Sequence, residues 1–355
     1  MSQEQQPTDN EVPTNAAWRG RIRVLLRRAN FRGLRVAAGT LLSMLFLWLA
    51  FRNVPVSQIV DAFGQLDWRF MTLALVLTLV GTLARAARWK LLYHPNHKNL
   101  NSLRMAEALF ISQMLNIVIP ARLGEVARIQ IMSQSGSRSR AVTLGTIVVE
   151  KWLDIVALIV IMFLVPISVS LPAWFQDSRK SLLAFVVAFF GVTLLLSYGK
   201  SWLLALLEST FHFLPNLWLR RLQQTTALAL GSLDVLRSPW VGLQLQAWSL
   251  LIWSMGILVN YIVFLILGLS LPFVAALFLL VVLQVGIAVP SVPGKLGIFQ
   301  YLCILALAPF GVGKSSALSY SVLLYFVAFG PLLLLGVFFT WWEGMREHHV
   351  KSVDS

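Results

Sequence analysis

The chain has 355 residues, of which 57% are hydrophobic and only 12% are charged. Soluble domains carry about 25% charged residues, so this composition excludes an ordinary water-exposed surface and predicts an integral membrane protein. The net charge of +14 fits the accumulation of Lys and Arg in the cytoplasmic loops of membrane proteins. No separate basic soluble domain is predicted, so nucleic acid is not an expected partner.

The N-terminal region is polar and then basic. Residues 1–17 are polar and predict a disordered cytoplasmic tail without a cleavable signal peptide. Residues 18–33 alternate arginines with apolar side chains, which predicts a basic amphipathic helix on the membrane surface. Such a helix either binds anionic headgroups or only fixes the N-terminus on the cytoplasmic side.

Apolar blocks then follow one another along the chain. In order, they are residues 34–51, 70–92, 105–119, 142–166, 182–198, 245–269, 272–289, 297–309 and 317–342. A helix needs about 20 apolar residues to cross a bilayer, so the blocks at 105–119 and 297–309 are too short to cross easily. Residues 201–237 are rich in Trp, Leu and Arg and are expected to lie at the interface.

Charge indicates how the first short block is arranged. Residues 85–104 and 122–140 are both basic and both favour the cytoplasm. The block between them, ending at Pro120, therefore has to enter the membrane and return. We expect a re-entrant helical hairpin with Asn116 and Gly124 near its tip.

The second half of the sequence repeats this pattern. Residues 119–125 and 289–295 each have an aliphatic residue, a proline, and a glycine four positions later followed by a charge. We predict an all-α polytopic membrane protein of six full crossings and two re-entrant hairpins, with both termini inside. These are eight apolar blocks in total when 272–289 and 297–309 are counted together as the second hairpin. Three crossings in each half make an inverted repeat; eight full crossings are the alternative. The membrane domain spans residues 34–342, with halves at 34–166 and 182–342, and residues 343–355 form a cytoplasmic tail.

Two acids inside an apolar block are the sharpest functional signal. Glu150 and Asp154 are spaced i, i+4 and so share one helix face. A charge at the bilayer centre costs roughly 2.5–3.5 kcal/mol, so both acids need partners or protons. They are either an ion or proton relay, an anchor for headgroup-binding arginines, or a structural buried salt bridge. The candidate partners are Arg88, Arg122, Arg128, Lys151 and Lys295.

Other polar residues lie beside the helix breaks. Arg122, Glu125 and Arg128 are spaced by three and form either a phosphate-binding or a snorkelling stripe. Helix breaks at membrane depth expose backbone N–H groups that favour anions, unless they are plain kinks. The candidate polar core comprises Arg88, Asn116, Pro120, Arg122, Gly124, Glu125, Arg128, Glu150, Asp154, Pro290, Pro293, Gly294, Lys295 and Gly297.

Motifs for catalysis are missing from the sequence. Cys303 is the lone cysteine, and His94 and His97 are better explained by a solvated loop than by a metal site. No phosphate-binding lysine loop and no nucleophile elbow occurs. We therefore expect no catalytic residue, no metal and no cofactor.

Four motifs resemble a known family. They are Arg85-Ala-Ala-Arg88-Trp89, Asn116-Ile-Val-Ile-Pro120-Ala-Arg122-Leu-Gly124-Glu125-Val-Ala-Arg128, Glu150-Lys-Trp-Leu-Asp154 and Pro290-Ser-Val-Pro293-Gly294-Lys-Leu-Gly297. Over residues 34–342 the chain resembles the flippase-like family of the transmembrane region of lysylphosphatidylglycerol synthases. The resemblance implies a lipid-translocating membrane domain with Arg122, Glu125, Arg128, Glu150 and Asp154 as its polar core. The full enzymes continue into a soluble aminoacyl-transfer domain, whereas this sequence ends at Ser355, so lysyl transfer is not expected.

The expected function is that of a lipid flippase in the bacterial inner membrane. Its substrate would be an anionic phospholipid or a polyprenyl-phosphate-linked lipid. Arg122, Arg128 and Lys295 would meet the phosphate, while Glu150 and Asp154 would hold these bases or pass protons. The alternative is a membrane scaffold, or an accessory subunit whose protein partners act in envelope lipid or glycan synthesis. An intramembrane enzyme acting on lipid-linked sugars is the weakest reading.

Overall fold

The computed structural model describes residues 64, 66–94, 100–119, 123–134, 139–164, 191, 209, 231, 235, 238–287 and 293–353. All regular elements within these residues are helices. The main ones are α4 (Trp68–Leu91), α5 (Ser102–Val118), α6 (Gly124–Gln134), α7 (Arg140–Leu164), α11 (Pro239–Ile266), α12 (Phe273–Ile287), α13 (Ile298–Leu307) and α14 (Lys314–Val353). The predicted tail, surface helix and first span, together with most of block 182–198 and most of the segment at 201–237, lie outside the described residues.

Three described helices are long and apolar enough to cross a membrane. They cover Trp68–Leu91, Trp240–Ile266 and Lys314–Glu343, which confirms apolar helices of spanning length at the blocks predicted at 70–92, 245–269 and 317–342. Helix α7 has 25 residues but carries Glu150, Lys151 and Asp154 in its apolar stretch. Helix α14 runs on to Val353 and includes Pro331 within the helix.

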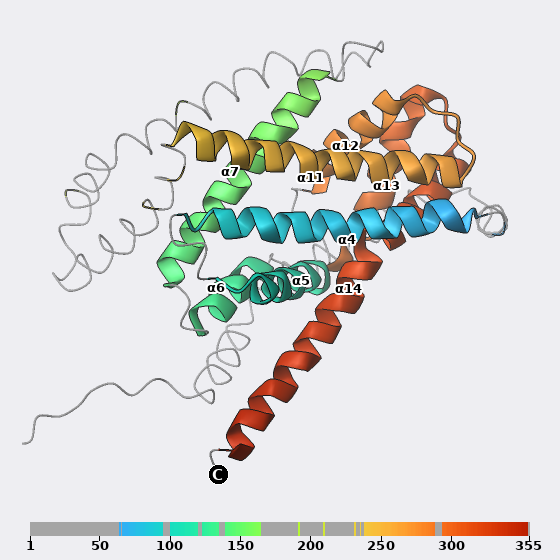
Figure 1. Cartoon of the computed structure of the whole chain (residues 1–355). Helices are drawn as coiled ribbons and strands as arrows, with labels where there is room; N and C mark the ends of the chain where they lie inside the picture. The colour runs from blue at the N-terminus through green and yellow to red at the C-terminus, as the bar shows by residue number, and fades with distance from the viewer. Residues whose placement is uncertain are drawn as a thin grey trace, which may run out of the picture.

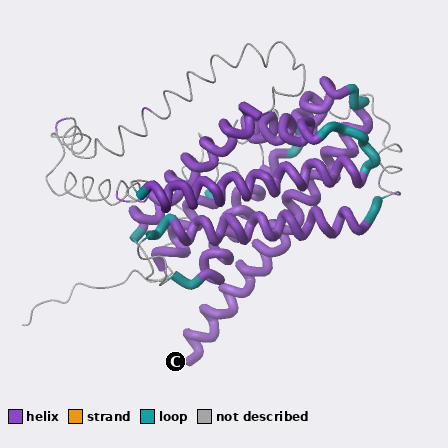
Figure 2. The backbone as a smooth tube through the Cα atoms, turned by 45° about the horizontal axis from the view of Figure 1, so that its top comes forward, coloured by secondary structure: helices purple, strands orange, loops and turns teal. Residues whose placement is uncertain are grey.

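Helices α4 and α11 lie side by side, and α14 slants across them (Figures 1 and 2). Helices α4 and α11 run antiparallel: Arg88 near the end of α4 meets Ser249 in the first half of α11, whereas Gly81 faces Met255. Helix α5 packs against α4, α6 and α14, and α7 packs against α6, α11 and α12. As a result, side chains of α4, α6, α7 and α11 meet in one region.

The first predicted break joins two packed helices, α5 and α6. Asn116 Oδ1 accepts a hydrogen bond from the backbone N–H of Gly124 at 2.8 Å. A Cβ atom on Gly124 would overlap the carbonyl oxygen of Ser112 and lie 2.6 Å from Asn116 Cγ. Because only glycine permits this approach, Gly124 sets the distance between the two helices.

The second break joins α12 and α13 through the 3₁₀ turn η4 (Pro293–Lys295). Gly294, Lys295 and Gly297 have φ angles of 77°, 56° and 83°, and the Gly294 carbonyl accepts a hydrogen bond from the Tyr325 hydroxyl at 2.7 Å. The turn η4 contacts α5, so the second break lies against the first helical pair. The re-entrant path, the crossing count, the inverted repeat and the orientation stay predictions.

At both breaks the backbone N–H of one glycine is already paired with a side chain. The backbone N–H of Gly297 donates to Gln300 Oε1 at 2.7 Å, as that of Gly124 donates to Asn116. In each pair the oxygen of a side-chain amide accepts a hydrogen bond from a glycine N–H at the start of the following helix. That N–H is therefore already paired and is not free to bind an anion. The sequence repeat aligns Gly124 with Gly294, but the glycine that precedes α13 and is held in this way is Gly297.

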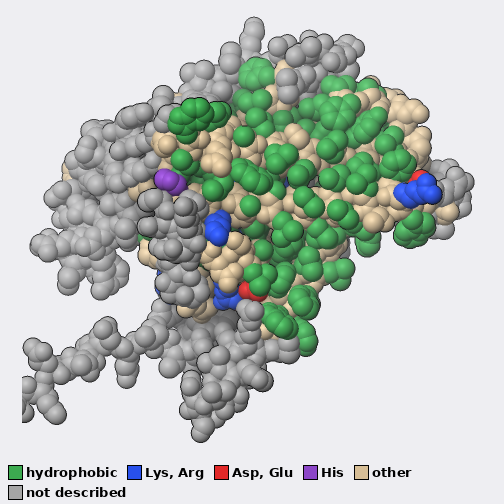
Figure 3. Space-filling view, viewed as in Figure 1, with side chains coloured by type: hydrophobic (Ala, Val, Ile, Leu, Met, Phe, Trp, Pro, Cys, Tyr) green, Lys and Arg blue, Asp and Glu red, His purple; other side chains and the backbone are tan. Residues whose placement is uncertain are grey.

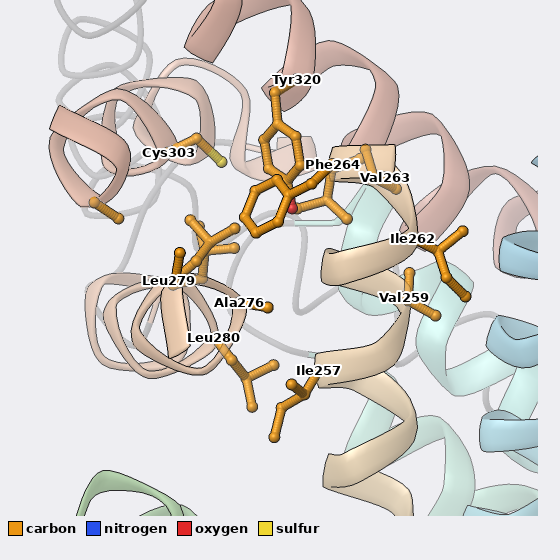
Figure 4. Packing of buried hydrophobic residues seen from close by; sticks show 14 of the residues in the cluster. Ile257, Val259, Ile262, Val263, Phe264, Ala276, Leu279, Leu280, Cys303 and Tyr320 are labelled. Atoms are coloured by element: carbon orange, nitrogen blue, oxygen red, sulfur yellow. The ribbon is translucent and has the colours of Figure 1, made fainter. Parts of the chain in front are cut away.

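An apolar core occupies the region between α11, α12, α13 and α14. The Phe264 and Tyr320 rings pack with centroids 4.8 Å apart, beside the buried Cys303 and Leu279 (Figure 4). The Tyr320 hydroxyl donates to the carbonyl oxygen of Asn260 at 3.0 Å. Polar groups in this core are thus paired, and none of its labelled side chains carries a charge.

One face of the molecule is covered by hydrophobic side chains, and the few charged groups on it lie away from its middle (Figure 3). On α4, Leu73, Val76, Val80 and Leu83 are 41–50% exposed and recur every three or four residues. Such a stripe is costly in water and suits acyl chains. The exposed stripe and the three long apolar helices indicate an integral, multi-pass membrane protein.

Candidate functional site

A buried charge cluster lies where α4, α6, α7 and α11 meet. We use this name for Arg85, Arg88, Arg128, Glu150 and Asp154. Arg88, Arg128 and Glu150 are only 1%, 3% and 5% exposed. Charged residues are almost never buried to this degree unless they are paired, so the arrangement of their partners is the main feature of the site.

The two acids of α7 bind two arginines in an alternating chain. Arg128 Nη2 lies 2.6 Å from Glu150 Oε2, and Arg88 Nη2 lies 3.7 Å from Glu150 Oε1. Arg88 Nη1 also donates to Asp154 Oδ1 at 2.7 Å. Glu150 therefore bridges the two arginines, and Arg88 bridges the two acids across three helices.

Two tryptophans, one on α4 and one on α11, contact the chain of ion pairs. The Arg128 guanidinium lies 3.9 Å from the ring centroid of Trp89, a cation–π contact. Trp253 Nε1 donates to Asp154 Oδ1 at 3.2 Å, and the Arg85 guanidinium lies 5.5 Å from the ring centroid of Trp253. Each end of this chain of ion pairs thus contains one indole and one guanidinium.

The hydroxyl of Ser249 on α11 also contacts Arg88. Arg88 Nη1 donates to Ser249 Oγ at 2.7 Å, and the Ser249 hydroxyl donates to the Leu245 carbonyl oxygen at 2.9 Å. Among the described residues, four polar atoms in the same region have no hydrogen-bond partner: Arg88 Nε, Arg128 Nε, and both side-chain polar atoms of Gln246. Gln246 is three residues before Ser249, so the two share one face of α11.

The structure brings some of the predicted site residues together and places others elsewhere. Arg88, Arg128, Glu150 and Asp154 are brought together in the cluster. Glu125 Oε1 lies 3.5 Å from Lys151 Nζ, so Lys151 pairs with Glu125, whereas Glu150 pairs with Arg88 and Arg128.

The remaining candidates belong to the breaks. Asn116 and Gly124 join α5 to α6, while Pro293, Gly294 and Gly297 shape the turn before α13. Lys295 Nζ lies 5.4 Å from the ring centroid of Phe329 on α14. Pro120, Arg122 and Pro290 lie outside the described residues.

Arg85, Trp253, Ser249 and Gln246 are absent from the candidate set predicted from the sequence. Arg85 is three residues before Arg88, and this i, i+3 spacing was a usable signal. The residues from α11 carry no comparable signal, because their role depends on the packing of α11 against α4. For metal binding, the described residues hold no group of three or more His, Cys, Asp or Glu side chains that could share an ion.

The fold and site define a polytopic helical membrane protein with an ion-pair cluster buried between its helices. Residues 36–336 match the family model described as the lysylphosphatidylglycerol synthase TM region. The chain therefore belongs to this family. It is also 24% identical, over 323 residues, to an archaeal protein described as UPF0104 membrane protein PH1989, from Pyrococcus horikoshii. That match covers 85% of this chain and 94% of the archaeal protein.

Proposed function

We propose that the protein exchanges an anionic lipid between the two leaflets of the bacterial inner membrane. The lipid is an anionic phospholipid or a polyprenyl-phosphate-linked lipid. The chain carries this out without covalent chemistry, as a transporter and not as an enzyme. Its membership of a family of synthase transmembrane regions supports a lipid as the substrate.

The observation that carries the proposal is the buried charge cluster. Glu150 and Asp154 lie on α7, whose sequence around them is apolar apart from Lys151. Arg88 lies on a helix that is long and apolar enough to span a membrane. Replacing a buried ion pair with apolar residues of similar volume is often neutral or stabilising. A bundle that needed only stability would therefore not require this cluster, whereas an anionic headgroup crossing the membrane needs guanidinium groups on its way.

The position of Arg128 suggests how the cluster works in exchange. Arg128 is on α6, a helix of 11 residues that Asn116 ties to α5. An anionic headgroup competes with Glu150 for the guanidinium of Arg128, because phosphate and carboxylate both match its donor fork. Glu150 keeps Arg88 as a partner when Arg128 turns to the headgroup, so neither acid is left without a cation.

A second candidate function is a membrane scaffold or an accessory subunit in envelope lipid or glycan synthesis. One observation favours it: both carboxylates of the cluster are already paired within the chain. In that case the cluster only holds α4, α6, α7 and α11 together. Protein partners in envelope lipid metabolism would then be required.

Leaflet exchange in proteoliposomes tests the proposal. Purified protein is reconstituted with a trace of a headgroup-intact, tail-labelled lipid, and a membrane-impermeant reagent bleaches the outer leaflet. Without exchange about half of the label is protected, because it lies in the inner leaflet. With exchange, well over half of the label is bleached. Labelled phosphatidylglycerol, a prenyl phosphate and zwitterionic phosphatidylcholine are compared, with and without a pH gradient. Bleaching that matches protein-free vesicles for all anionic lipids would contradict the proposal.

A further inference from the structure

Three guanidinium groups of the charge cluster face only two carboxylates. Arg128 pairs with Glu150, and Arg88 pairs with Asp154 and Glu150. Arg85 forms no ion pair with any described residue; its guanidinium lies over the Trp253 ring. The charges that act on Arg85 are those of Asp154, Arg88 and Glu150, so it belongs to the cluster and leaves it with one excess positive charge.

This excess charge lies at an unfavourable place for an isolated cation. Arg85 is a half-buried residue on α4, within the apolar span Trp68–Leu91. A guanidinium remains charged under physiological conditions, so Arg85 cannot lower its energy by losing a proton. A charge in a membrane span is stabilised only by a partner, by water or by a ligand.

The end of the cluster that contains Arg85 is also its more open end. The Asp154 side chain is 20% exposed, whereas the Glu150 side chain is 6% exposed. Trp253 connects the two residues there, since its ring faces Arg85 and its Nε1 donates to Asp154. A ligand can therefore approach Arg85 without first breaking the pair between Arg128 and Glu150.

We propose that Arg85 is the primary contact for the phosphate of the lipid, and that the site takes a phosphodiester headgroup with one net negative charge. One such charge neutralises the excess positive charge of the cluster. A phosphomonoester carries nearly two negative charges above its second ionisation, and the second would be repelled by Asp154. A headgroup with a quaternary ammonium would bring a cation beside Arg85 and Arg88. This assignment rests on the proposed lipid exchange. It makes Arg85, instead of Arg122, Arg128 or Lys295, the first residue to contact the phosphate.

Lipid binding to the purified full-length chain tests the assignment. Native mass spectrometry compares phosphatidylglycerol, phosphatidic acid and phosphatidylcholine at pH 8 for the natural protein and for Arg85→Gln. We expect the natural protein to prefer phosphatidylglycerol over both other lipids. Arg85→Gln should lose about tenfold in affinity for phosphatidylglycerol, the value of one charged hydrogen bond. Soluble glycerophosphoglycerol and inorganic phosphate serve as competitors, to separate a lipid site from a free-phosphate site.

Two further variants keep the test decisive. Arg69→Gln removes an exposed arginine from the start of the same helix and should leave lipid preference unchanged. Arg85→Lys keeps the charge and should retain most of the preference even if the glutamine variant folds poorly. Unchanged phosphatidylglycerol binding in a folded Arg85→Gln protein, or phosphatidic acid binding as tight as phosphatidylglycerol, would overturn the assignment.

The leaflet-exchange assay separates this inference from the proposed function. If Arg85→Gln exchanges phosphatidylglycerol at the natural rate, the inference fails and lipid exchange stands. If the natural protein binds phosphatidylglycerol through Arg85 but exchanges no lipid, the inference stands and the proposed function fails.

Discussion

The charge cluster and the apolar core both lie between packed helices but differ in content. Around Glu150, three guanidinium groups, two carboxylates and two indoles come from α4, α6, α7 and α11. Around Phe264 and Tyr320, the side chains from α11 to α14 are apolar apart from paired groups such as Asn260. Helix α11 contributes to both regions: Ser249 and Trp253 face the charges, and Phe264 lies in the core.

This contrast shows that packing stability and the buried charges lie in different regions of the same helical bundle. The apolar core gains its stability from packing and needs no directional partners. The charge cluster depends on each partner being present, because a buried charge left alone is costly. Variants that disturb the two regions should therefore differ in what they change besides stability.

The largest effect is expected for Glu150→Gln. This change leaves Arg128 and Arg88 without the carboxylate that joins them, and breaking a buried pair in this way costs about 3–5 kcal/mol. Unfolding in detergent, followed by tryptophan fluorescence, should show this loss. Lipid exchange by the folded fraction should fall as well.

Leu279→Ala in the apolar core is the matched comparison. Leu279 is fully buried, so the cavity should cost about 2–5 kcal/mol. Because no charge changes, the folded fraction should keep its lipid preference and exchange rate. Equal losses of exchange per folded molecule in both variants would show that the two regions do not differ in function.

A smaller effect is expected for Gly124→Ala at the joint between α5 and α6. The added Cβ meets the Ser112 carbonyl oxygen, and overpacking of this kind costs about 1–3 kcal/mol. The shift would move Arg128, four residues later, relative to Glu150. Thermal unfolding in detergent measures the loss. Gly81→Ala, whose Cβ would lie 3.8 Å from Met255 Sδ, should be nearly neutral; a loss as large as that of Gly124→Ala would contradict the explanation.

The smallest effect on stability is expected for Gln246→Leu. The side-chain amide of Gln246 has two buried atoms without a hydrogen-bond partner, and an unsatisfied buried polar group costs about 1–3 kcal/mol. Leucine should therefore be neutral or slightly stabilising in thermal unfolding. A clear destabilisation would mean that the amide of Gln246 has a partner in the folded protein.

Much of the cluster could be predicted from the sequence. The i, i+4 pair Glu150 and Asp154 in an apolar block required cations, and the short basic segments offered Arg88 and Arg128. Local rules were sufficient because the cost of an isolated charge in a membrane span does not depend on the fold. The spans at 70–92, 245–269 and 317–342 followed from composition in the same way.

The surroundings of the cluster could not be predicted. Ser249 meets Arg88 across 161 positions, and Trp253 meets Asp154 across 99. These contacts depend on the packing of α11 against α4 and α7. The hydrogen bond from the Gly297 N–H to Gln300 could not be predicted either, because the sequence repeat aligns glycines by spacing and carries no information on which backbone N–H donates to a side-chain amide.

The most direct test of the central claim is leaflet exchange by the double variant Arg128→Met with Glu150→Leu. This variant removes one positive and one negative charge together, so the net charge of the cluster is kept and the bundle should stay folded. If the cluster carries an anionic headgroup, exchange of labelled phosphatidylglycerol should fall to the level of protein-free vesicles while thermal stability is retained. Exchange at the natural rate by the folded double variant would show that this ion pair only holds the helices together.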